Sequence, residues 1–257
     1  MQFTHAITRL PADTFSQGIS TANLGKPVLK KAVKQHADYV GALQQSGLTR
    51  MVLPPAPAFP DSVFVEDTAI VTHDFAVISR PGAHSRLGEI DEMSTILRYH
   101  FSKVHQIQAP GTLDGGDVCQ VEGHFFIGIS ERTNPGGAQQ LADFLKMHAY
   151  THEFVDIRGL SGILHLKSAV NYLGEETLLV DPRMAGHPSF QKYRRLVVDL
   201  DDAYSANCLR VNDIVLVPSG FPRTLDTVQK AGFQTIELNV SEYRKMDGGL
   251  SCLSLRW

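Results

Sequence analysis

The sequence predicts an α/β fold of five similar units that close into a ring. The order strand, turn, strand, helix, strand recurs along the 257 residues. Chemically distinctive residues recur with it, at separations of 47, 51, 42 and 45 residues: Asp67, Asp114, His165, Asn207 and Cys252. The fifth unit is divided between the two ends of the chain. A period of this length is typical of repeat architectures, and pairing of the two ends would complete the ring.

The first two complete units show the pattern most clearly. Unit one has predicted strands at 64–71 and 75–79, a helix at 85–99 and a strand at 103–108. We expect Ser85 to be the N-cap of that helix, because apolar residues follow it at helical spacing. Unit two has predicted strands at 117–121 and 125–129, a helix at 135–147 and a strand at 153–157.

The remaining units repeat this order. Unit three is predicted at 166–173, 177–181, a helix near 188–194, and 195–200; unit four is predicted at 207–211, 214–218, a helix at 222–231, and 234–239. In unit five, the segment 250–257 supplies the first strand, and the N-terminal part supplies a strand at 5–9, a helix at 27–45 and a strand at 49–53. Closed rings of this kind bring their first strands together around one axis, so residues at the starts of those strands should share a pocket.

Composition limits the possible functions. The length suits a single domain over residues 1–257, and a net charge of −3 gives no sign of a nucleic-acid partner. No apolar run is long enough for a membrane span, and the N-terminus does not resemble a signal peptide. Three cysteines in a chain of this length argue against a disulfide scaffold. They form no Cys-x-x-Cys pair, which argues against a structural zinc site. We expect a cytoplasmic protein with no membrane partner, and a homodimer is compatible with the sequence.

The recurring positions carry a set of groups for nucleophilic catalysis. Cys252 supplies a thiol, His165 an imidazole that exchanges protons near neutral pH, and Asp114 a carboxylate that can orient the imidazole. Asp61 and the pair Glu66 and Asp67 add three further acids.

Clustered carboxylates repel one another, and a planar guanidinium cation relieves that repulsion through paired hydrogen bonds. Such a cation would also favour the thiolate form of Cys252. The residues therefore indicate a thiol that attacks the carbon of a bound guanidinium.

Seven segments resemble those of the dimethylarginine dimethylaminohydrolase family. They are FPDSVFVED (59–67), ISRPGAHSR (78–86), TLDGGDV (112–118), RTN (132–134), LHLKS (164–168), ANC (206–208) and KMDGGLSC (245–252). This family belongs to the guanidino-group-modifying superfamily, whose fold is a five-fold pseudosymmetric α/β-propeller of ββαβ units. The resemblance extends over nearly the whole chain.

The resemblance implies a role for each matching residue. It implies that Cys252 forms a covalent thiouronium intermediate, that His165 protonates the departing amine and then activates water, and that Asp114 orients His165. It also implies a set of substrate-binding residues: Asp61, Glu66 and Asp67 around the guanidinium, Arg86 and Arg132 at the α-carboxylate, and the backbone carbonyls of Leu24 and Met246. The implied substrate is a methylated L-arginine, the implied products are citrulline and dimethylamine or methylamine, and no cofactor or metal is involved.

Two alternatives remain open. The same residues are compatible with deimination of unmethylated L-arginine, whereas the two arginines disfavour agmatine, which lacks a carboxylate. A protein that binds a guanidino compound without converting it is the second alternative. A product assay with arginine, monomethylarginine and asymmetric dimethylarginine distinguishes all three hypotheses.

Overall fold

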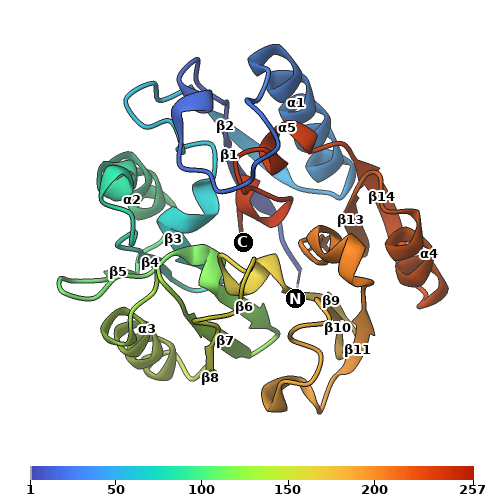
Figure 1. The fold of residues 1–257 in the computed structure, drawn as a ribbon. Coiled ribbons are helices and arrows are strands. Elements are labelled where there is room, and N and C mark those ends of the chain that lie inside the picture. Colours follow the sequence, from blue (N-terminus) through green and yellow to red (C-terminus); the bar gives the residue numbers. More distant parts are fainter. Residues whose placement is uncertain (1) are drawn as a thin grey trace.

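Five small three-stranded sheets surround a common centre in the computed structural model, which describes residues 2–257 (Figure 1). In every sheet the second strand lies in the middle, antiparallel to the first and parallel to the third. The structure therefore has an α/β fold in which one strand pattern occurs five times.

Four of the sheets are each formed by one continuous segment. The first contains β3 (Ala69–Val71), β4 (Ala76–Ile78) and β5 (Val104–Gln106), and the second β6 (Val118–Val121), β7 (His124–Ile129) and β8 (Thr151–Asp156). The third contains β9 (Val170–Gly174), β10 (Thr177–Val180) and β11 (Arg194–Val197), and the fourth β12 (Leu209–Val211), β13 (Ile214–Pro218) and β14 (Gln234–Leu238).

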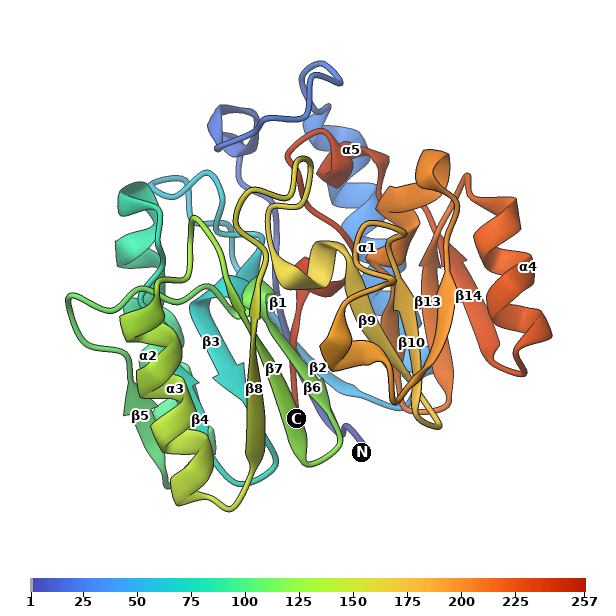
Figure 2. The same ribbon diagram turned by 60° about the horizontal axis from the view of Figure 1, so that its bottom comes forward.

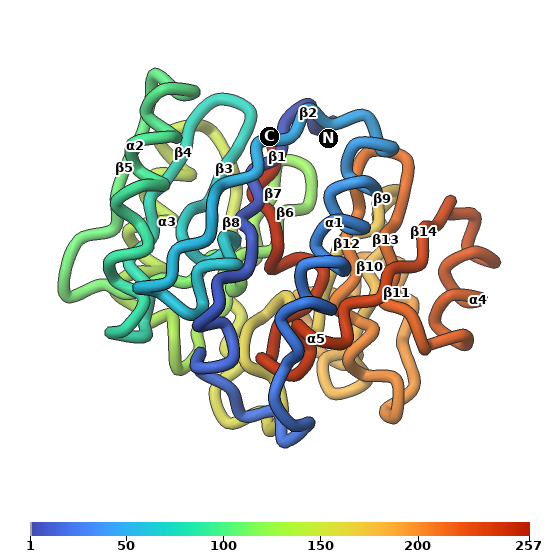
Figure 3. The backbone as a smooth tube through the Cα atoms, turned by 90° about the horizontal axis from the view of Figure 1, so that it is seen from above, coloured from blue at the N-terminus to red at the C-terminus, as the bar shows by residue number. Residues whose placement is uncertain are grey.

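The fifth sheet joins the two ends of the chain. It contains β15 (Leu255–Arg256), β1 (His5–Arg9) and β2 (Thr49–Leu53). Ala6 lies opposite Arg256, and the backbone N–H of Thr4 donates to the carbonyl of Trp257 over 2.7 Å. The expected pairing of the chain ends is therefore present, and Figure 3 shows the two ends side by side.

The helices cover the outside of the sheets (Figure 1). They are α1 (Leu29–Gln45), α2 (Ile90–His100), α3 (Pro135–Met147) and α4 (Pro222–Lys230), whereas the short α5 (Ser241–Arg244) packs against α1. Their inner faces are apolar: Leu141 and Leu145 of α3, for example, join a buried cluster with Phe75 and Ile127. Across residues 2–257, none of the helices has the length and apolar character that crossing a bilayer would require.

Three details differ from the sequence-based expectations. No α-helix forms near 188–194: a 3₁₀ helix at Pro188–Phe190 takes its place, and the fully buried Phe190 ring fills the core there. Ser85 does not cap α2, because it lies within a 3₁₀ helix at His84–Glu89 that directly precedes α2. A buried ion pair between Arg86 and Glu89 lies within this 3₁₀ helix. The helix expected at 27–45 begins at Leu29.

The first strands are also shorter than expected. Each of these strands begins only after a short 3₁₀ helix. Their expected starts were at residues 64, 117, 166, 207 and 250. This difference matters for the site, because Asp67 and Cys252 lie in those 3₁₀ helices, and Asp114 and His165 directly precede two of them.

Candidate active site

A short 3₁₀ helix precedes the first strand of every sheet. These helices span Val65–Thr68, Gly115–Asp117, Leu166–Ser168, Leu200–Ala206 and Ser251–Leu253. They contact one another at one end of the sheets, whereas both chain ends lie at the opposite end (Figure 2). Polar residues far apart in sequence therefore meet at this end, as in the hydrogen bond from Ser251 Oγ to Glu66 Oε2.

A pocket opens among these 3₁₀ helices. It is lined by seven of the ten residues predicted for the site: Asp61, Asp67, Arg86, Arg132, His165, Met246 and Cys252. Ile19, Phe64, Leu164, Asp247 and Gly248 complete the lining. The convergence expected from the repeat is therefore present for most of the predicted residues.

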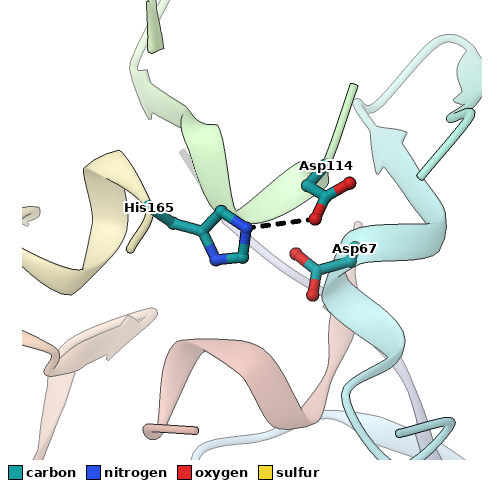
Figure 4. A group of neighbouring side chains, drawn as sticks. All are labelled: Asp67, Asp114 and His165. Carbon is teal, nitrogen blue, oxygen red and sulfur yellow. Dashed lines mark hydrogen bonds and ion pairs between the residues drawn. The ribbon is translucent and has the colours of Figure 1, made fainter. Parts of the chain in front are cut away.

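His165 and Asp114 form a buried hydrogen-bonded pair at this pocket (Figure 4). His165 Nε2 lies 3.1 Å from Asp114 Oδ2, and the other carboxylate oxygen of Asp114 accepts from the N–H of Gly82 at 2.8 Å. Burial alone would lower the pKa of His165, but the surrounding carboxylates, Asp67 foremost, raise it to about 9. The imidazole is therefore cationic at neutral pH and can act as an acid.

Asp67 lies beside this pair and contacts Arg86. Its Oδ1 accepts from the N–H of Gly116 at 2.9 Å, and its Oδ2 accepts from Arg86 Nη1 at 2.5 Å. Although burial opposes ionisation, the nearby positive charges of His165 and Arg86 hold the pKa of Asp67 below its usual value. Asp67 is therefore a carboxylate that faces the pocket.

Cys252 is a partly buried thiol in the last 3₁₀ helix. Its Sγ accepts from the N–H of Gly249 at 3.4 Å and lies 3.9 Å from Asn207 Nδ2. Burial and the nearby carboxylates of Glu66 and Asp67 raise the pKa of the thiol. The thiol is therefore protonated, and a cation bound beside it would favour its ionisation.

The two arginines of the pocket differ in how they are paired. Arg86 is 5% exposed and forms ion pairs with both Asp67 and Glu89. For Arg132, the structure of residues 2–257 records no ion pair. Of the two guanidinium groups, that of Arg132 is therefore the more available to an anionic group in the pocket.

Three predicted residues lie outside the pocket lining. Asp114 is fully buried behind His165. The carboxylate of Glu66 accepts from Lys167 Nζ at 2.6 Å and from Ser251 Oγ at 2.9 Å, and it lines a different cavity. Leu24 is 51% exposed and lines a neighbouring cleft that shares Leu164 and Asp247 with the pocket.

A loop at the pocket entrance, residues 18–22 and called here the entrance loop, was not predicted from the sequence. Asp247 accepts from the backbone N–H of Thr21 at 2.5 Å and from its hydroxyl at 3.0 Å, while Ser20 Oγ donates to the carbonyl of Lys245 at 2.8 Å. Asp247 has a φ of 58°, an uncommon value for a residue other than glycine. Its position directly before Gly248-Gly249 was the only available signal in the sequence.

The described residues contain one group of three potential metal ligands: Asp67, Asp114 and His165, whose ligand atoms lie within 4.8 Å of one another. The carboxylate oxygens of this group already accept hydrogen bonds from Gly116, Arg86, Gly82 and His165. The arrangement therefore favours an acid–base cluster over a metal centre.

Comparison with known proteins places this fold and site in one family. A family model described as arginine deiminase matches residues 21–197. The chain is 42% identical to the N(G),N(G)-dimethylarginine dimethylaminohydrolase of Pseudomonas aeruginosa, over 99% of this chain and 100% of that protein. It is 32% identical to the protein of the same name from Streptomyces coelicolor, over 98% of this chain and 96% of the other.

A solved structure gives the same result. The structure of the P. aeruginosa dimethylarginine dimethylaminohydrolase in complex with citrulline matches with a TM-score of 0.97 and 40% identity, over 100% of both chains. The fold, the pocket and the family model together define a protein of the arginine deiminase class. Within that class, the chain belongs to the dimethylarginine dimethylaminohydrolase family.

Proposed function

We propose that this protein hydrolyses Nω-methylated L-arginine to L-citrulline, releasing dimethylamine or methylamine. One observation carries the proposal: the Cys252 thiol, the His165–Asp114 pair and the Asp67 carboxylate meet at one site in a chain that is 42% identical to a dimethylarginine dimethylaminohydrolase over its whole length. A thiol, an acid–base group and a carboxylate are the groups that such a hydrolysis requires.

In the proposed mechanism, the Cys252 thiol gives up its proton to solvent as the cationic substrate binds, and the thiolate attacks the guanidinium carbon of the substrate. The S–C bond forms, the imidazolium of His165 donates its proton to the departing amine, and the C–N bond to that amine breaks. Neutral His165 then removes a proton from water, which attacks the same carbon. The S–C bond breaks, the proton of the new hydroxyl group passes to the departing sulfur, and citrulline is released from the re-formed thiol of Cys252.

The electrostatics of the pocket suit this order of events. The thiol is protonated before the substrate binds, because burial and nearby carboxylates raise its pKa. A guanidinium cation beside Asp67 offsets those negative charges, and the thiolate then forms next to the carbon that it attacks. Asp114 keeps the imidazole in place, and it stabilises the cationic form of His165.

The substrate-binding roles follow from position in the pocket. Asp67 and Asp61 are proposed to face the guanidinium, and Arg132, aided by Arg86, to bind the α-carboxylate. Met246, in the pocket wall, and Leu24, in the neighbouring cleft, would contribute backbone carbonyls. Glu66 would act through Ser251, since its carboxylate faces away from the pocket.

The wider description of the protein also belongs to this proposal. We infer a single domain in which the five sheets form a five-fold pseudosymmetric propeller, with β15 and β1 completing the ring. The chain carries three free thiols, which suit a reducing, cytoplasmic environment, and the proposed reaction needs no cofactor.

The test is citrulline formation from arginine, monomethylarginine and asymmetric dimethylarginine. We expect turnover of at least one methylated substrate and its loss in Cys252→Ser and His165→Ala. Cys119→Ser is the matched control, because that thiol is buried in a separate core cluster. Full turnover by Cys252→Ser contradicts the mechanism, and turnover of arginine alone contradicts the substrate assignment.

A further inference from the structure

A second cavity lies on the side of the Glu66–Lys167 pair that faces away from the candidate active site. All five first strands contribute to its wall, which includes Ala69, Val118, Asn171, Leu209 and Leu255. We call it the axial cavity. It has a volume of about 110 Å³ and shares four wall residues with an outer chamber of about 310 Å³: Phe3, Val71, Gln120 and Arg256.

The charged groups of the axial cavity are mainly basic. Lys167, Arg210 and Arg256 line it together with a single acid, Glu66. Lys167 and Glu66 neutralise each other, since Nζ lies 2.6 Å from Oε1. The charges of the two arginines are therefore the ones available to a ligand in this cavity.

Arg256 is oriented by neutral groups. Its Nη1 donates to the carbonyl of Ser254 at 2.9 Å and to the hydroxyl of the same residue at 2.6 Å, and its guanidinium lies 5.8 Å from the Phe3 ring. Its Nε–H is buried without a hydrogen-bond partner, and no carboxylate pairs with it among residues 2–257. The guanidinium is therefore held in place with a donor unused.

Arg210 is held in a similar way on β12. Its Nε donates to the carbonyl of Asn212 at 2.8 Å, and its guanidinium lies 5.7 Å from the Tyr172 ring. Its buried Nη1 makes no hydrogen bond, and the same atom lies 3.5 Å from Glu122 Oε1, in the wall of the outer chamber, in a long ion pair. Buried N–H donors without acceptors are unfavourable. One cavity wall holds such a donor on Arg256 and a second donor, on Arg210, that has only a long ion pair, so the wall favours a further acceptor.

We propose that the axial cavity binds a small oxyanion, of the class of inorganic phosphate or a short carboxylate, between Arg210 and Arg256. Phosphate and carboxylate oxygens match the N–H geometry of arginine, and two guanidinium groups that are already oriented lose little freedom on binding. The site differs from the candidate active site in its residues, because the two walls share none.

The test is isothermal titration calorimetry with inorganic phosphate and, separately, with acetate, at constant ionic strength maintained with sodium chloride. We expect saturable binding of at least one anion, weakened at least tenfold by Arg256→Gln and by Arg210→Gln. Arg256→Lys keeps the charge and part of the packing, and it should weaken binding less than Arg256→Gln. Tight binding of phosphate alone identifies the ligand as a phosphate, and equal binding of acetate identifies a carboxylate site.

Two control variants locate the bound anion. Arg132→Gln removes the more available arginine of the candidate active site, and Arg158→Gln removes an exposed arginine that pairs with Asp156. Arg158→Gln should bind the anion as the unmodified protein does, whereas Arg132→Gln should remove only the part of the heat that comes from anion bound in the candidate active site. The proposal is overturned if neither anion gives heat beyond the sodium chloride control, or if Arg132→Gln abolishes binding while Arg210→Gln leaves it intact.

Discussion

His36 makes the stability of this protein depend on pH, through a group far from the chemistry. It lies on the inner face of α1, is 1% exposed, and its Nε2 is buried without a hydrogen-bond partner. Burial lowers its pKa from 6.5 to about 4. The folded protein therefore keeps this imidazole neutral at a pH where the unfolded chain binds a proton.

The size of the effect follows from the two pKa values. The folded-state pKa lies below the unfolded-state pKa, so the contribution to stability is present above pH 6.5 and is lost as the pH falls towards about 4. At about 1.4 kcal/mol for each unit of pKa, the full loss is about 3 kcal/mol, and roughly 2 kcal/mol of it falls between pH 7 and pH 5.

Urea denaturation at pH 7 and pH 5 measures this loss as a change in the free energy of unfolding. The loss between the two pH values should be about 2 kcal/mol smaller in His36→Phe than in the unmodified protein. Any packing cost of the substitution cancels, because it is present at both pH values. His73→Phe is the control, because the His73 side chain is 89% exposed. Between pH 7 and pH 5, this variant should lose as much free energy of unfolding as the unmodified protein does. An equal loss in His36→Phe and in the unmodified protein refutes the reasoning.

Three further predictions concern the site and its supports. Lys167→Met should cost about 3–5 kcal/mol in urea denaturation, because it leaves the buried Glu66 carboxylate without its partner, and adding Glu66→Gln should restore part of that loss. Gly115→Ala should cost about 1–3 kcal/mol, since a Cβ there would overlap the carbonyl of Glu66, whereas Gly123→Ala, which faces open space, should change stability by less than about 0.5 kcal/mol. Asp247→Gly suits the positive φ but removes the acceptor of the entrance loop, so hydrogen exchange in that loop should accelerate and KM should rise; unchanged exchange would contradict a tethering role.

The sequence was most informative where local signals agree. The helix predicted at 135–147 has the observed bounds, because Asn134 caps it with its side chain and Pro135 begins it. The strands at 5–9 and 49–53 are also confirmed. The helix expected near 188–194 was wrong because burial of Phe190, a tertiary effect, determines that segment.

The site shows the same division between local and long-range information. The period of the repeat located the residues that meet, since those positions precede the first strands. It did not predict that Glu66 and its neighbour Asp67 face opposite directions, one towards Lys167 and the other towards Arg86. The direction of each side chain depends on the 3₁₀ helix and on partners far away in the sequence, Lys167 being 101 residues from Glu66.

Because β15 pairs with β1, the two termini lie close together, and the chain could be given new termini at another position. A short peptide linking the two ends would turn the fifth sheet into a local structure, since those ends already share hydrogen bonds. A new break in the exposed loop near Gly159, between β8 and β9, would leave every sheet within one continuous segment. Such a circular permutant would form all five sheets from neighbouring strands, so it should fold faster than the present chain, in which the first and last strands must first find each other.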